Sequence, residues 1–266
     1  MPDRITSVSN PRIRRLVELR RKAKARRESG TFLIEGTRLC MDTPVQFLTE
    51  SYVTENWLSG SSMAERKHLD GIPVTVVSEE VMAKAADTET PQGILCAARM
   101  PAYRREDLLG KGEQTPLLLV LEDIQDPGNL GTIFRTAEAA GATGILMSRG
   151  TVDLFNPKVV RATMSAIFRM PFLVCGDLCE EIRSLRESGI RTYAAHLGGR
   201  RPYDALPLTQ GAAFLIGNEG NGLSDRITKA ADEKIIIPMC GGAESLNAAM
   251  AAGILLFEAS RQRRRM

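Results

Sequence analysis

The first side chains that could take part in chemistry lie in residues 122–131. Asp126-Pro127-Gly128 is a turn sequence there, and Asn129 is a good N-cap for the helix predicted to follow. Arg135 stands near the start of that helix and off its apolar stripe, where a cation gains nothing from the helix dipole. A solvated arginine explains this motif by itself.

A second group occupies residues 217–224, directly after an apolar run. Its glycines follow the order G-x-x-G-x-G, not the G-x-G-x-x-G of dinucleotide folds, which argues against a nucleotide-dependent oxidoreductase. No Lys or Arg occurs from Gly217 to Asp225, and Glu219 is central, the opposite of what a phosphate site needs. The loop favours a positively charged ligand without phosphate, such as S-adenosylmethionine. A plain turn with an exposed Glu219 explains it equally well.

A third group follows the apolar run Ile235-Ile236-Ile237. Pro238 ends this predicted strand, and Ser245 or Asn247 can cap the Ala-rich helix that comes next. Capping accounts for one of these two polar residues but not for both. The small residues of the helix would let a neighbouring element or a second subunit approach closely.

All three groups come directly after predicted strands. The larger C-terminal part of the chain shows six such strands, with helical patterns between them, at residues 116–121, 144–148, 171–174, 191–195, 213–216 and 234–237. The alternation predicts a parallel α/β sheet, in which ligands gather at the carboxyl ends of the strands. The three groups are therefore expected to meet at one edge of this sheet.

The N-terminal part has a similar but smaller pattern. Predicted strands at residues 32–36, 73–77 and 93–98, with helical segments between them, indicate a small α/β domain. We expect a basic helix or arm over residues 1–30, the small domain over 31–99, a charged linker over 100–115 and the larger domain over 116–266.

Charge is distributed unevenly along the chain. Residues 1–30 carry ten Arg or Lys against three acids, so this segment is +7 while the whole chain is only +3. A local basic block of this kind is typical of a polyanion-binding segment, although a solvated amphipathic helix has the same composition.

Composition excludes several classes of protein. No apolar run is long enough to span a bilayer, and the first residues lack the apolar core expected of a secretory signal. Asp3, Glu18 and Glu28 argue against a mitochondrial transit peptide. The five cysteines are irregularly spaced and only two histidines occur, so we expect free thiols in a reducing cytoplasm and no metal site.

Taken in order, the three groups resemble the SpoU (TrmH-like) family of RNA ribose 2′-O-methyltransferases in the SPOUT superfamily. The matching patterns are Asn129-x5-Arg135, Gly217-Asn-Glu219-Gly220 and Ile237-Pro-Met-x5-Ser245-Leu-Asn247. Residues 32–36 and 90–94 are similar to the family's substrate-binding domain, which is like ribosomal protein L30e. The resemblance implies a trefoil-knotted parallel α/β domain, an L30e-like α/β domain and a homodimer.

The resemblance also implies roles for individual residues. S-adenosylmethionine would be held by Leu215, Ile216, Gly217, Asn218, Gly220, Ile237, Met239 and Leu246. The reaction site would comprise Asn129, Arg135, Glu219, Ser245 and Asn247, and it is left open whether Asn129 and Arg135 come from a second subunit. Because a guanidinium is effectively always protonated, we expect Arg135 to stabilise the developing alkoxide or grip a phosphate instead of acting as a base.

The expected reaction is methylation of a ribose 2′-hydroxyl in ribosomal RNA. Transfer RNA is the alternative substrate, and a non-catalytic RNA-binding relative is the alternative class of protein. The presence of all five reaction-site residues argues against the latter.

Overall fold

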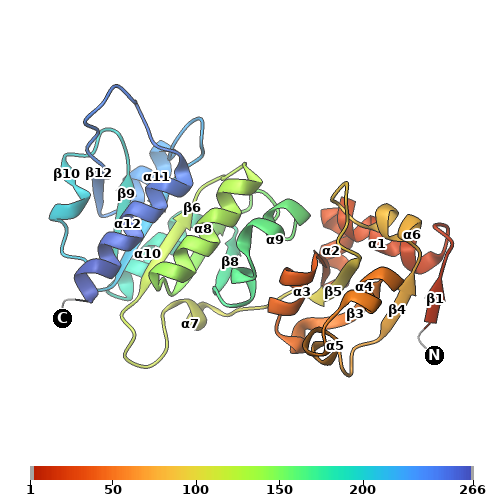
Figure 1. Ribbon diagram of the computed structural model, residues 1–266. Helices are drawn as coiled ribbons and strands as arrows, with labels where there is room; N and C mark the ends of the chain where they lie inside the picture. Colours follow the sequence, from red (N-terminus) through yellow and green to blue (C-terminus); the bar gives the residue numbers. More distant parts are fainter. Residues whose placement is uncertain (1–2, 265–266) are drawn as a thin grey trace. The chain divides into compact units, whose positions relative to one another are not determined.

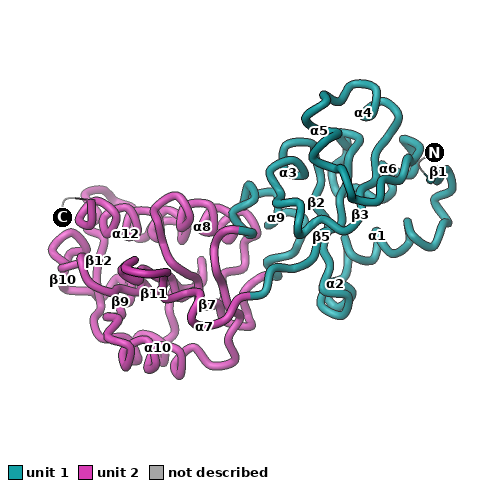
Figure 2. Tube along the Cα trace, turned by 90° about the horizontal axis from the view of Figure 1, so that it is seen from below, with its two compact units in different colours: residues 1–102, 153–168 teal, residues 103–152, 169–266 magenta. Residues whose placement is uncertain are grey.

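The computed structural model describes residues 3–264, so the predicted domain limits at residues 1 and 266 fall outside the described chain. The described chain forms two compact units (Figure 2). The first contains the residues up to Ala102 together with Asp153–Phe168. The second contains Tyr103–Val152 and the residues from Arg169 onward.

The first unit is built on a five-stranded sheet in the order β1-β4-β3-β5-β2. The strands pair in parallel from β1 to β3, and β5 is antiparallel to both β3 and β2. Their bounds are Asp3–Ile5 (β1), Thr31–Glu35 (β2), Leu48–Val53 (β3), Val74–Val77 (β4) and Ile94–Arg99 (β5). The three strands predicted from sequence are present, and β1 and β3 are additional.

Short helices surround this sheet (Figure 1). They are α1 (Pro11–Arg21), α2 (Ala23–Ser29), α3 (Thr37–Asp42), α4 (Glu55–Gly60), α5 (Met63–His68), α6 (Glu79–Ala85) and α9 (Pro157–Thr163), with 3-10 turns η1 (Val45–Phe47) and η2 (Ala166–Phe168).

Helix α1 belongs to the core of the first unit. Asn10 caps it by accepting a hydrogen bond from the Arg12 N–H at 2.9 Å. Ile13, Leu16 and Leu19 are at most 2% exposed. Burial of each such side chain stabilises the fold by about 1.5–3 kcal/mol. Residues 1–30 were expected as a separate arm; the apolar stripe of α1 instead covers the sheet, so its described part belongs to the first unit.

The segment Asp153–Phe168 belongs to the first unit. The sequence had predicted that it would be part of the larger domain, over residues 116–266. The Phe32 ring lies 4.9 Å from the Phe155 ring and 5.8 Å from the Phe168 ring, measured between centroids. The Arg26 guanidinium, which is almost fully buried, forms an ion pair with Asp153. This packing joins residues far apart in sequence, which local patterns do not reveal.

The second unit contains a seven-stranded parallel sheet in the order β10-β12-β9-β11-β6-β7-β8. The bounds are Leu117–Leu121 (β6), Gly144–Ser148 (β7), Phe172–Cys175 (β8), Arg191–Ala195 (β9), Arg201–Pro202 (β10), Ala212–Ile216 (β11) and Glu233–Ile236 (β12). All six predicted strands are present, which confirms the parallel α/β class of this part of the chain.

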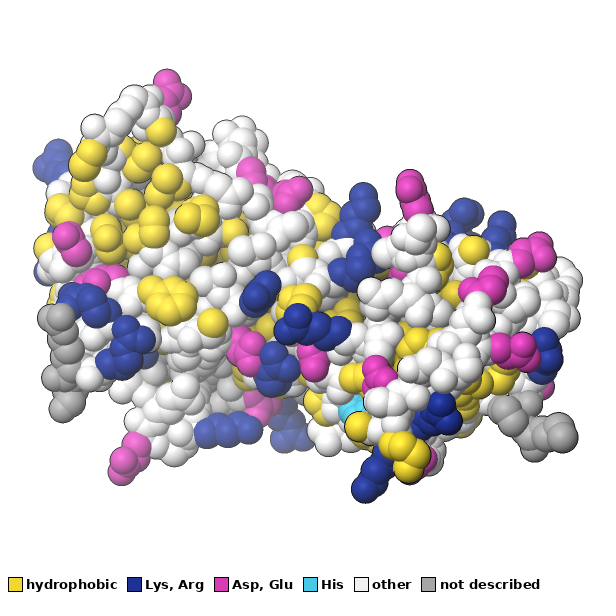
Figure 3. All heavy atoms as spheres, in the orientation of Figure 1, with side chains coloured by type: hydrophobic (Ala, Val, Ile, Leu, Met, Phe, Trp, Pro, Cys, Tyr) yellow, Lys and Arg dark blue, Asp and Glu magenta, His cyan; other side chains and the backbone are white. Residues whose placement is uncertain are grey.

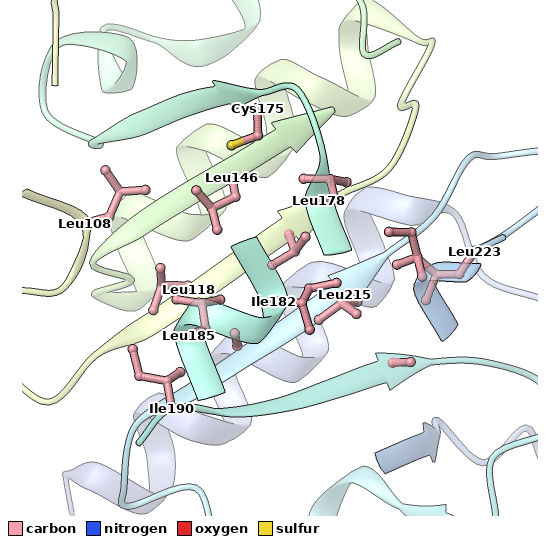
Figure 4. Packing of buried hydrophobic residues seen from close by; sticks show 14 residues of the cluster. Leu108, Leu118, Leu146, Cys175, Leu178, Ile182, Leu185, Ile190, Leu215 and Leu223 are labelled. Carbon is pink, nitrogen blue, oxygen red and sulfur yellow. The ribbon is translucent and has the colours of Figure 1, made fainter. Parts of the chain in front are cut away.

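Helices cover both faces of this sheet. They are α7 (Arg105–Leu108), α8 (Pro127–Ala140), α10 (Leu178–Glu187), α11 (Asp225–Ala230) and α12 (Ala248–Arg263), with the 3-10 turn η3 (Tyr203–Ala205). Helices α8 and α12 lie together on one face, and α10 lies on the other (Figures 1 and 2). Leu118, Leu146 and Leu215 of the strands pack there against Ile182 and Leu185 of α10 (Figure 4).

Within residues 3–264, no helix is long and apolar enough to cross a membrane. The same range contains no group of three or more His, Cys, Asp or Glu side chains placed to hold a metal ion.

Candidate active site

A cavity of about 320 Å³ lies where three neighbouring strands of the second unit end. In the sheet, β9 lies between β11 and β12, so the loops that follow these strands are adjacent. The cavity is lined by Ala195–Leu197 after β9, by residues 216–223 after β11 and by parts of residues 236–246 after β12. The carboxyl ends of parallel strands thus build the site, as expected for an open α/β sheet.

Most of the predicted cofactor residues line this cavity. They are Ile216, Gly217, Asn218, Gly220, Ile237, Met239 and Leu246. Leu215 is the exception: it is fully buried in the core cluster that faces α10. Side chains of a strand alternate between the two faces of a sheet, so Ile216 can reach the cavity only if Leu215 points away from it.

The glycines of residues 217–222 allow two stretches of backbone to approach closely. A Cβ atom on Gly217 would lie 2.1 Å from the carbonyl carbon of Gly222, and Gly222 has φ +67°. The main chains of Asn218 and Gly222 exchange hydrogen bonds of 3.1 and 2.9 Å. The Asn218 side chain also accepts from the N–H groups of Gly220 and Asn221. The glycine order therefore produces a tight loop that fixes Glu219.

The carboxylate of Glu219 accepts three hydrogen bonds from the loop after β6 and the start of α8. The donors are the N–H groups of Gln125 at 3.0 Å and Asp126 at 3.1 Å and the Nδ2 amide of Asn129 at 2.9 Å. Partial burial raises the pKa of Glu219, but these hydrogen bonds outweigh it and leave the pKa below its usual value. Glu219 is therefore ionised at neutral pH.

Asn129 carries this network across to the third motif. Its Oδ1 accepts a hydrogen bond of 2.8 Å from Nδ2 of Asn247. The Oδ1 of Asn247 accepts from the N–H groups of Ala249 and Met250 at the start of α12. The sequence did not decide whether Ser245 or Asn247 caps α12. Asn247 is the cap, and Ser245 lines the cavity.

The prediction that Asn129 caps the helix after β6 is wrong. Asp126 is the N-cap of α8, and its Oδ1 accepts from the N–H of Asn129 at 2.7 Å. Since Pro127 can occupy the first helical position, the helix begins earlier than expected. The side chain of Asn129 is consequently available for Glu219.

Arg135 stands apart from the other predicted reaction-site residues. It is exposed on α8, does not line the cavity, and makes no hydrogen bond or ion pair with any residue in the described range. A single chain therefore brings Asn129, Glu219, Ser245 and Asn247 to the cavity region without the cation.

Several parts of the cavity wall were missed from sequence, among them Leu223 and the α12 residues Ala248 and Ala251. Glu244 lies inside the third motif, and His196 and Leu197 follow β9, which carries no conspicuous motif. The rule that ligands gather at the carboxyl ends of strands, applied to β9 as well, would have indicated the His196 loop.

The sequence profile of the SpoU rRNA methylase family matches residues 116–257. The chain belongs to this family. A second profile, the MRM3-like substrate binding domain, matches residues 10–96.

Other members of the SpoU rRNA methylase family align over nearly the whole chain. The 23S rRNA (guanosine(2553)-2'-O)-methyltransferase RlmP of Bacillus subtilis is 32% identical, over 95% of this chain and 97% of its own. The AdoMet-bound rRNA methyltransferase of Sinorhizobium meliloti is 31% identical with a TM-score of 0.82, over 97% of both chains. AviRb of Streptomyces viridochromogenes, in complex with AdoMet, is 26% identical with a TM-score of 0.82, over 96% of this chain and 98% of its own.

Proposed function

We propose that this protein transfers the methyl group of S-adenosylmethionine to a ribose 2′-hydroxyl of ribosomal RNA. The observation that carries the proposal is the meeting of the second and third motifs in one cavity, joined through Asn129 to the first motif. The similarity over both units to RlmP, a 23S rRNA 2'-O-methyltransferase, supports ribosomal RNA as the substrate.

The lining of the cavity suits S-adenosylmethionine. Its walls include the aliphatic side chains of Ile216, Leu223 and Ile237, which suit an adenine ring. No Lys or Arg of the described chain lines the cavity, whereas Glu219 and Glu244 do, and their negative charge favours a ligand that carries a sulfonium and an ammonium.

S-adenosylmethionine supplies an already activated methyl group, so the chain has mainly to align the ribose oxygen and assist loss of its proton. Glu219 fixes the orientation of the Asn129 amide, and Asn129 fixes that of Asn247. Together with Ser245, these groups are placed to orient the sugar. Arg135 stabilises the developing alkoxide or grips the adjacent phosphate.

A homodimer would bring Arg135 to the cavity. Arg135 is exposed and unpaired within the described chain, and α12 exposes Met250 at 60% and Phe257 at 43%. Hydrophobic side chains gather over α12 in Figure 3. We propose that a second copy covers this face and supplies its Arg135.

Two inactive variants, Arg135→Ala and Glu219→Ala, should then regain activity when their subunits are mixed, because one site of the mixed dimer has both residues intact. No recovery in verified mixed dimers would contradict a shared site.

We also propose a trefoil knot in the C-terminal segment and a cytoplasmic location, both of which the family resemblance implies. The C-terminal segment forms a trefoil knot, in keeping with the return of α12 onto β6 and β11 after the chain has added β12 beyond β9. The protein acts in the cytoplasm, in keeping with five free cysteines and a ribosomal RNA substrate.

The decisive experiment is transfer of labelled methyl from S-adenosylmethionine to unmodified ribosomal RNA and, separately, to unmodified transfer RNA. A 2′-O-methylated position resists alkaline cleavage, which needs a free 2′-hydroxyl. We expect one resistant position in ribosomal RNA; label only in transfer RNA would contradict the substrate assignment.

Cofactor binding can be measured independently of transfer. Cys240 lies in the cavity loop and is exposed, whereas Cys40, Cys96 and Cys175 are buried. We expect S-adenosylmethionine to slow alkylation of Cys240. Absence of both protection and transfer would favour a non-catalytic RNA-binding protein.

A further inference from the structure

His196 belongs to the one cavity loop that no sequence motif marked. It directly follows β9, between the loops that follow β11 and β12, and both His196 and Leu197 line the cavity. The ring is partly buried. The position of His196 therefore makes it part of any ligand site formed by these loops.

The backbone of this loop is held tightly against β12. The His196 N–H donates to the Ile235 carbonyl at 3.0 Å, and the Gly199 N–H donates to the His196 carbonyl at 2.9 Å. A Cβ atom on Gly199 would lie 2.4 Å from the carbonyl carbon of Ile235, so only glycine permits this approach. The imidazole is thus mounted on a rigid turn.

The hydrogen bonding of the ring determines which nitrogen carries the proton. Nδ1 of His196 accepts a hydrogen bond of 2.9 Å from the Gly198 N–H. In a neutral imidazole one nitrogen accepts and the other donates, so Nε2 carries the hydrogen. His196 therefore offers the cavity wall a neutral N–H donor.

The carboxylate of S-adenosylmethionine is the group that most needs such a donor. Among the described residues no Lys or Arg lines the cavity, and the lining residues Glu219 and Glu244 both repel a negative group. A neutral donor binds a carboxylate without placing positive charge beside the sulfonium. On the basis of the proposed function, we infer that Nε2–H of His196 binds the methionyl carboxylate and so selects ligands that retain the amino-acid half.

The test measures the affinity of the RNA-free protein for three ligands by equilibrium titration. S-adenosylmethionine and S-adenosylhomocysteine carry the carboxylate, whereas 5′-methylthioadenosine lacks it. The variants are His196→Ala, which removes both ring interactions, and His196→Asn, whose Oδ1 can still accept the Gly198 N–H in an Asx-turn but whose amide is too short to replace Nε2.

We expect both variants to bind the two carboxylate ligands about 10- to 100-fold more weakly, as for loss of a hydrogen bond to a charged group, and 5′-methylthioadenosine unchanged. If His196→Asn bound the two carboxylate ligands as tightly as the wild type, His196 would serve only to support the loop, and the inference would be overturned. An equal loss for 5′-methylthioadenosine would also overturn it. If the wild-type protein bound none of the three ligands, the proposed function itself would fail.

Discussion

At the scale of single residues, Glu219 determines the direction of a whole chain of hydrogen bonds. A carboxylate can only accept, so the NH2 group of Asn129 must face Glu219 and its oxygen must face Asn247. Asn247 then has its own oxygen turned toward the N–H groups of α12. Because the pKa of Glu219 is lowered, its contribution to stability is present above the usual glutamate pKa and is lost as the pH falls through the lowered value.

Glu219→Gln tests this direction. Three N–H donors converge on the side chain, and a glutamine would point its own NH2 group at one of them. We expect kcat/KM for methyl transfer to fall roughly 10- to 100-fold, with little change in unfolding free energy because the residue is exposed. Glu244→Gln is the matched control, since Glu244 lines the same cavity without a hydrogen bond inside the described chain. Equal losses of kcat/KM in both variants would assign the effect to charge alone.

At the scale of elements, some basic residues of α1 and α2 are bonded within the first unit and others are exposed to solvent without a partner in the described chain. Arg12 pairs with Asp3 and Arg15 with Glu50, while Arg20 donates to backbone carbonyls. The exposed arginines at positions 14, 21 and 27 have no partner in the described chain. Deletion of residues 1–30 would remove core side chains as well as charge, so it cannot isolate RNA binding.

Substitution of Arg14, Arg21 and Arg27 by Gln isolates the charge. If these side chains contact phosphates, the log–log slope of RNA affinity against salt should flatten by roughly 2–3 units. The control removes three unpaired exposed cations of the second unit, Arg183, Lys229 and Lys234. Thermal melting verifies that both triple variants are folded. An equal change of slope in the control would mean that the first unit is not the preferred RNA contact.

At the scale of the whole molecule, one segment of the first unit lies within the sequence range of the second. The polypeptide leaves the second unit after Val152, completes the first with Asp153–Phe168 and returns at Arg169. Arg26 is buried with its guanidinium bonded to Asp153 and to the carbonyls of Leu19 and Arg20. The first unit therefore depends on residues that are translated long after its own sheet.

Asp153→Ala tests this dependence. It leaves the Arg26 charge buried without its counter-ion, which we expect to destabilise the first unit by about 3–5 kcal/mol. Urea unfolding should show the loss, and Arg26→Met with Asp153→Ala should recover part of it because the double variant has no unpaired charge. A single variant as stable as the wild type would mean that the ion pair contributes nothing to holding the segment.

The sequence alone indicated most of the strands and the three motifs, but not β1, β3 or β10. Continuous apolar runs such as residues 117–121 are typical of strands covered on both faces, and the acid, amide and glycine residues after them indicated the site. Local patterns could not show that Asp126 would cap α8 and release Asn129, because neighbouring residues compete for the same helix end. Nor could they show which strand lies between β11 and β12, and hence that His196 lines the cavity. These outcomes depend on contacts between residues distant in sequence, so only the tertiary structure decided them.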